Sequence, residues 1–187
     1  MINNFLFDSL LIDDYDKFVE NLYNYSSLID TQNVHGESLL HFSAFYGIID
    51  KYYALINFGA KDSLTHLKNN LLHYACFSGN DDFLIVELIK NNINPMETNL
   101  EGETVLHLCA NERIAHYLNL WCHRNNFKPE NLLDNKGNTI LHSAYQYGFY
   151  KTADYWKKSF PELLLVKNFD NQLWNETPHK IKYFCKG

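Results

Sequence analysis

The strongest constraint in the sequence is an eight-residue pattern that recurs four times at nearly constant spacing. The copies begin at residues 37, 69, 103 and 138 and read ESLLHFSA, NNLLHYAC, ETVLHLCA and NTILHSAY. Their histidines recur at intervals of 32, 34 and 35 residues. A fixed period between about 20 and 50 residues is typical of proteins that stack one small structural unit on the next. The chain is therefore expected to fold as a stacked array.

Each copy also carries the signals of a short helix between two turns. A side chain suited to capping a helix N-terminus lies three residues before each histidine, at Ser38, Asn70, Thr104 and Thr139. In three units a glycine precedes this cap by two residues, and in three units another glycine follows the histidine by six residues, where turns favour a positive φ. Longer amphipathic stretches follow at 48–60, 80–93, 113–125 and 149–160. Each unit is predicted to be a turn, a short helix, a second turn and a longer helix.

This pattern resembles the ankyrin repeat, a unit of about 33 residues with the signature T-P-L-H-x-A. The resemblance implies an all-α fold, an ankyrin-repeat solenoid of stacked helix-turn-helix units joined by β-hairpin-like fingers. Terminal units of such arrays act as caps with a polar outer face. We expect one domain with an N-terminal capping helix pair at 1–30, four repeats at 31–64, 65–97, 98–133 and 134–168, and a truncated C-terminal capping repeat at 169–187.

Two units depart from the pattern. The second has Lys68 where its neighbours have the turn glycine. The third lacks the glycine after its first helix, continues as CANERIAHYL, and ends in a long exit at 125–134. No complete unit has the signature proline. We therefore expect a shortened or distorted helix junction and a protruding loop in the third unit.

Charge and composition narrow the class of partner and the compartment. The formal net charge is −6 and no run of Lys and Arg forms a basic patch, so neither nucleic acid nor an anionic membrane is expected as a partner. No signal peptide is expected, because the apolar stretch near the N-terminus lacks a preceding basic residue and is interrupted by aspartates. The four cysteines show no CxxC spacing and are expected to be free thiols in the cytoplasm. Abundant Asn, Ile, Lys, Tyr and Phe indicate an AT-rich, microbial genome.

The aligned histidines are expected to be structural rather than metal ligands. Equivalent positions in stacked repeats lie about 8–10 Å apart, whereas zinc holds its nitrogen ligands at about 2.0–2.1 Å. Each imidazole has two nitrogens that can satisfy polar groups at the turn, and the resemblance to ankyrin repeats implies that role. No metal and no cofactor is expected. The structural histidines are His41, His73, His107 and His142.

A Cys/His-dependent enzyme or a metal-binding protein is the minor alternative. It would need side chains of the irregular third unit to converge, namely Cys109, His116, Cys122 and His123. A reactive thiolate needs an exposed, electropositive setting, and nothing in the sequence provides one. Phosphate-binding loops, GxSxG and HExxH are also absent. We therefore expect a non-catalytic protein.

Binding is expected on the concave face, because stacked repeats offer an extended surface there. The resemblance implies contacts from the fingers and from residues just after the small-residue pair of each first helix. Aromatic side chains in this set suit a protein interface, and its carboxylates would select a partner with a basic or mixed apolar and basic surface. The set contains Val34, His35, Glu37, Phe45, Tyr46, His66, Leu67, Asn69, Phe77, Ser78, Leu100, Glu101, Glu103, Asn111, Glu112, Asn135, Lys136, Asn138, Gln146 and Tyr147.

Two biological roles remain open for such a protein-binding module, which is expected to be a monomer on its own. A cytosolic inhibitor, such as an immunity-type blocker of another protein, is favoured because the chain is nearly all repeat and has no second domain. The alternative is an adaptor or secreted microbial effector that engages a host protein. No feature of the sequence separates the two roles.

Overall fold

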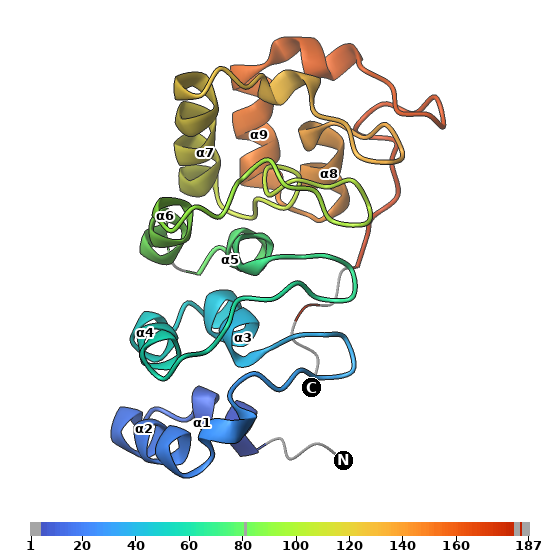
Figure 1. Ribbon diagram of the computed structural model, residues 1–187. Coiled ribbons are helices and arrows are strands. Elements are labelled where there is room, and N and C mark those ends of the chain that lie inside the picture. Colours follow the sequence, from blue (N-terminus) through green and yellow to red (C-terminus); the bar gives the residue numbers. More distant parts are fainter. Residues whose placement is uncertain (1–4, 81, 182–183, 185–187) are drawn as a thin grey trace.

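The computed structural model describes residues 5–80, 82–181 and 184, and these form one stack of helices (Figure 1). The stack begins with α1 (Phe5–Leu11) and α2 (Tyr15–Asn24). The pairs α3 (Leu39–Tyr46) with α4 (Ile49–Asn57) and α5 (Leu71–Ser78) with α6 (Asp82–Lys90) follow. Then come α7 (Glu112–Arg124) and the pair α8 (Ile140–Gln146) with α9 (Tyr150–Ser159). Short 3-10 turns are η1 (Ser26–Leu28), η2 (Pro129–Asn131) and η3 (Pro161–Leu165).

The first helices begin at the predicted capping residues. The Asn70 side chain accepts a hydrogen bond from the His73 backbone N–H at 3.1 Å, and the Thr139 hydroxyl serves α8 in the same way. The helices α3 and α5 end at Gly47 and Gly79, whose φ values of 67° and 66° are left-handed. These caps satisfy backbone groups that a helix end would otherwise leave without partners. The fold class predicted from the repeats, an all-helical stack, is confirmed.

The third unit differs most from the prediction. Its expected first helix is only a turn, held by the Leu108 N–H to the Val105 carbonyl at 3.2 Å. Without the glycine that ends α3 and α5, the chain leaves this turn directly, and the Ala110 N–H donates to the Cys76 carbonyl of the preceding unit at 3.0 Å. The Asn111 side chain then caps α7, which has 13 residues. The expected distortion is confirmed, and the expectation of a complete first helix is wrong here.

The exit from the third unit folds back on the stack, so the expectation of a protruding loop is wrong. The Phe127 ring stacks on Trp121 with centroids 5.7 Å apart, and the Phe127 N–H donates to the Cys122 carbonyl at 2.9 Å. Pro129 is buried in η2. Aromatic stacking and burial therefore hold a segment that looks like a loop in the sequence.

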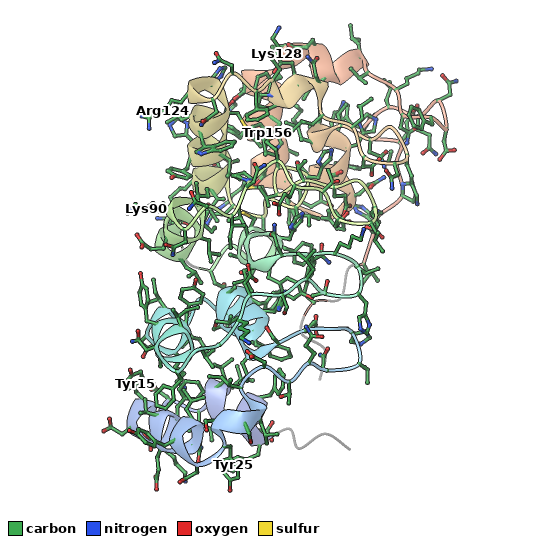
Figure 2. The ribbon with its side chains drawn as sticks, viewed as in Figure 1. Tyr15, Tyr25, Lys90, Arg124, Lys128 and Trp156 are labelled. Atoms are coloured by element: carbon green, nitrogen blue, oxygen red, sulfur yellow. The ribbon has the colours of Figure 1, made fainter. Side chains whose placement is uncertain are left out.

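One hydrophobic core runs through all the units. Leu22, Leu40, Leu72 and Leu106 are almost completely buried in successive units and belong to the same cluster. Trp156 of α9 is fully buried, and Figure 2 labels it within the stack. Because each unit buries its apolar surface against its neighbours, the units stabilise one another. Among the described residues, no helix is both long enough and apolar enough to cross a membrane.

Five turn segments, called fingers below, project from the stack at 33–37, 65–69, 99–103, 134–138 and 168–172. In the finger at 99–103, the Asn99 side-chain oxygen accepts from the N–H groups of Glu101 and Glu103 at 2.9 and 3.0 Å. Asn33, Asp134 and Asn168 make the same pair of bonds in their fingers. Such turns replace backbone pairing by a side chain. Within the described residues, strand-like pairing is limited to two isolated bridges.

The fingers are tied to one another along the stack. The His66 N–H donates to the His35 carbonyl at 3.0 Å, and the Leu100 N–H donates to the Leu67 carbonyl at 2.9 Å. Asn135 and Phe169 continue this series to the fifth finger. The fingers therefore form one ordered ridge beside the first helices. This side of the molecule, formed by the fingers with α3, α5 and α8, is called the finger face.

Candidate protein-binding face

The four aligned histidines lie beneath the fingers and connect successive units. The Nδ1 atoms lie 2.7–3.1 Å from the side-chain oxygens of the four capping residues, and each capping N–H donates to the same Nδ1. The proton therefore belongs on Nε2. The Nε2 atoms of His73 and His142 donate to the carbonyls of Glu103 and Gln172 in the next unit, at 3.1 and 3.2 Å. Within the described residues, Nε2 of His41 and of His107 has no such partner.

Burial keeps the imidazoles of His41, His107 and His142 neutral. It lowers the pKa of His41 from 6.5 to about 4, although the nearby carbonyl of Asn69 and the charge of Glu37 oppose the effect. Burial also lowers the pKa of His107 and of His142. In the part of the chain that the structure describes, no group of three Cys, His, Asp or Glu side chains is placed to hold a metal ion.

The twenty predicted contact residues divide by exposure. Nine are exposed: Val34, His35, Tyr46, His66, Leu67, Leu100, Glu112, Asn135 and Lys136. Six are half-buried: Phe45, Phe77, Ser78, Glu101, Asn111 and Tyr147. Five are buried, and for these the expectation of an exposed side chain is wrong: Glu37, Asn69, Glu103, Asn138 and Gln146.

The buried members serve as connectors between fingers. The Glu37 carboxylate accepts from the Tyr74 hydroxyl and from the Asn33 amide, both at 2.6 Å. The Asn69 side-chain oxygen accepts from the Asn99 amide at 3.0 Å. The position directly before each cap therefore points into the stack. A buried polar side chain needs such partners, which explains why this position is polar in every unit.

Aromatic rings of the first helices form a cluster on the finger face rather than four separate exposed contacts. The Phe77 ring lies 5.6 Å from Tyr147 and 5.3 Å from Phe149, measured between centroids, in edge-on geometry. Phe45 meets Tyr46 at 5.2 Å. Among the four predicted aromatics, only Tyr46 is exposed, at 39%. The cluster spans units one, two and four because the third unit has no first helix.

Two residues of the C-terminal segment lie on the finger face although the sequence does not predict them there. Phe184 is 7% exposed and packs on Phe45, Tyr74 and Phe77. Lys180 reaches the carboxylates of Glu101 and Glu103. The sequence predicts this segment only as a truncated capping repeat. The basic and aromatic residues of this segment are the signal that could have placed it on the finger face, because the predicted contact residues there are acidic and aromatic.

A polar network surrounds Lys180. The Tyr147 hydroxyl donates to Glu103 at 2.5 Å, and the Lys180 ammonium donates to the same carboxylate oxygen at 3.1 Å. Burial opposes the charge of Lys180, but the carboxylates of Glu103 and Glu101 outweigh it and raise its pKa. Burial and the Glu103 charge raise the pKa of Tyr147, so its hydroxyl stays protonated and can donate.

The alternative Cys/His site does not assemble a reactive thiol. Cys109 and Cys122 are buried free thiols, and burial raises their pKa to about 12 and about 11. Such thiols stay protonated at neutral pH and are poor nucleophiles. His116 is exposed and pairs with the Tyr155 hydroxyl at 3.4 Å. Cys185, also considered in the sequence, lies outside the described residues.

A known protein family matches part of the repeat region. A family model described as ankyrin repeats (3 copies) matches residues 72–156, from α5 through most of α9. The predicted boundaries of the caps and of the individual repeats stay predictions. No significant match was found among curated proteins. Ankyrin repeats are protein-interaction modules and are generally non-catalytic. The family match over residues 72–156, the capped helices and the stacked fingers together support an ankyrin-repeat protein.

Proposed function

We propose that the chain is a non-catalytic, cytosolic inhibitor that binds another protein through its finger face and thereby blocks it. One observation carries the proposal. Apolar side chains at or beside the tips of four fingers are exposed, by 81% at Val34, 48% at Leu67, 50% at Leu100 and 74% at Phe169. Single exposed apolar residues are ordinary. Val34, Leu67 and Leu100 on three hydrogen-bonded neighbouring fingers make an apolar edge of the kind that partners cover, and Phe169 lies on the fifth finger, beyond the polar fourth one.

Charge indicates the chemistry of the partner. Glu101 lies on the third finger beside this edge, and Glu112 is exposed at the start of α7. An apolar edge next to carboxylates complements a surface that is partly apolar and partly basic. The hydrogen bonds between fingers support tight binding, because a preordered surface loses less entropy on association.

An adaptor is the second candidate, and a specific feature of the second helices favours it. A pocket of about 270 Å³ lies between α4 and the chain after α6, lined in part by Tyr52, Tyr53 and Ile56. Tyr53 and Ile56 are 38% and 41% exposed. An adaptor needs two contact surfaces, and this pocket provides one away from the fingers.

The test is quantitative affinity capture from the source cell with the full chain. The variant Val34→Asp/Leu67→Asp/Leu100→Asp is expected to reduce recovery of the main partner at least tenfold, or about 1.4 kcal/mol of binding free energy. The matched control, Leu120→Asp/Leu165→Asp, changes exposed residues outside the fingers and outside the pocket beside α4 and should leave recovery unchanged. Equal recovery with both variants would refute binding through the fingers. Loss of the purified partner's activity at one equivalent of the chain distinguishes an inhibitor from an adaptor.

A further inference from the structure

The C-terminal segment occupies the aromatic part of the finger face. Phe184 lies against rings from two consecutive units, with its centroid 4.4 Å from Tyr74, 4.5 Å from Phe77 and 6.3 Å from Phe45. These geometries are edge-on for Tyr74, tilted for Phe77 and stacked for Phe45, as aromatic rings prefer. The half-buried rings of α3 and α5 therefore form a socket for one aromatic side chain.

The same segment places a cation on the acidic part of the face. The Lys180 ammonium lies 3.1 Å from Glu103 and 3.6 Å from Glu101, and 3.3 Å from the Tyr147 hydroxyl. The Lys180 backbone N–H donates to the Gln146 carbonyl at 2.8 Å. The Glu103 side chain has no exposed surface, so its charge requires a compensating group. The second socket is therefore built for a basic side chain.

The two sockets are spaced for an extended chain. Four extended residues span about 13 Å, which is between one and two of the roughly 8–10 Å helix-packing distances along the stack. Lys180 lies beside the third finger and α8, and Phe184 lies beside α3 and α5. Figure 1 shows the red C-terminal segment running back past α8 toward α5, against the order of the units.

The C-terminal segment leaves part of the finger face open as a groove. A pocket of about 390 Å³ remains between Ile181, Phe184 and the first three fingers, lined also by His35 and Leu67. Ile181 itself is 76% exposed. The open pocket beside Ile181 and Phe184 leaves part of the finger face accessible while the segment is in place, and local detachment of this segment does not require the stack to unfold.

We propose that the finger face binds an extended protein segment with a basic residue and, four positions later, an aromatic residue, and that residues 180–184 are a competing internal occupant that such a segment displaces. The inference rests on the proposed function, because it names the ligand and the regulation of the same face. The internal segment lowers the apparent affinity for a partner in proportion to the fraction of time that the groove is open.

The experiment uses fluorescence anisotropy with the full chain and a labelled peptide, residues 177–187 carrying Cys185→Ser. The variant Lys180→Ala/Phe184→Ala empties both sockets and is expected to bind this peptide at least tenfold more tightly than the wild-type chain does. The matched control, Leu165→Ala/Lys167→Ala, changes exposed residues earlier in the C-terminal region and should bind as the wild type does. Peptides carrying Lys180→Glu or Phe184→Ala should lose the tighter binding.

Equal peptide affinity for the wild-type and emptied chains would overturn the proposal, as would tight binding of the altered peptides. Circular dichroism checks that the double variant is folded, and Lys180→Ala alone replaces it if it is not. Failure here is distinguishable from failure of the proposed function. Tighter peptide binding with no partner in the capture experiment would support the groove and contradict the inhibitor. The opposite result is a captured partner that is lost with the finger variant but recovered equally from Lys180→Ala/Phe184→Ala. That result would support the inhibitor and contradict the groove.

Discussion

At the scale of single residues, histidine chemistry explains the most regular feature of the sequence. Each imidazole accepts from the backbone N–H of its cap and is placed to donate toward the next unit. The sequence predicts this role because a histidine at fixed distance from a capping residue is a local signal. Local spacing does not reveal that Nε2 reaches a carbonyl in His73 but has no partner among the described residues in His107.

Replacement of His107 should test that role. His107→Ala is expected to lower the free energy of unfolding by roughly 1–3 kcal/mol, because it leaves the Thr104 N–H without its buried partner. Urea unfolding at pH 7.5 measures the change. The exposed His123 supplies the control, since His123→Ala should leave the midpoint unchanged. Equal midpoints for His107→Ala and the wild type would contradict a structural role.

At the scale of elements, the N-terminal end of the stack is held by a side chain that reaches across the fold. Lys51 of α4 is buried, and its ammonium donates to the Leu10 carbonyl at 2.7 Å and to the Ile12 carbonyl. It thereby satisfies carbonyls at the C-terminal end of α1, which a helix cannot pair internally. The same ammonium lies over the Phe18 ring of α2. The sequence shows Lys51 only as one charge in an amphipathic stretch.

Removal of this cap should loosen the N-terminal helix pair. Lys51→Ala is expected to cost roughly 1–3 kcal/mol of unfolding free energy, since it strands carbonyls that are otherwise bonded. Limited proteolysis should then cut first within α1 and α2. Lys61→Ala removes the same charge from an exposed site and should leave the cleavage pattern unchanged. Unaltered cleavage in Lys51→Ala would show that apolar packing alone holds the pair.

Two glycines with the same backbone conformation should differ in the stability that is lost when alanine replaces them, because only one of them lies against a neighbouring finger. Gly102 and Gly148 have φ values of 77° and 76°, so alanine is strained at both. At Gly102 the added Cβ would lie 2.7 Å from the Asn135 backbone nitrogen, whereas at Gly148 it would meet nothing within 4 Å. Gly102→Ala should therefore be less stable than Gly148→Ala by roughly 1–3 kcal/mol. Thermal unfolding measures both, and equal losses would contradict the close packing of fingers.

At the scale of the whole molecule, the histidines make the stack sensitive to acid. The imidazoles of His41, His107 and His142 are neutral when folded, because burial lowers the pKa of His41 to about 4 and lowers that of His107 and of His142. In the unfolded chain they regain an ordinary pKa of about 6.5. Below that pH the unfolded state binds more protons, so stability falls as the pH falls.

Unfolding free energy should therefore decrease between pH 7.5 and pH 5.0. His41 alone accounts for roughly 2 kcal/mol over that interval, at about 1.4 kcal/mol for each pH unit below 6.5. Urea unfolding at several pH values should show a shallower dependence for His41→Gln. The exposed pair His35→Gln/His66→Gln should follow the wild type. A flat profile for the wild type would contradict buried neutral imidazoles.

The sequence by itself determined the repeat, its capped helices and the position of the fingers, because these depend on spacing over a few residues and on a period near 33 residues. It did not reveal that the third unit lacks its first helix, or that the position before each cap is buried. Nor did it place the C-terminal segment, whose Lys180 meets Glu103 from 77 positions away. That contact forms only because the stacked units bring the Glu103 carboxylate and the Tyr147 hydroxyl, from different units, to one surface. Only the tertiary structure could decide that the face suited to a partner already holds part of its own chain.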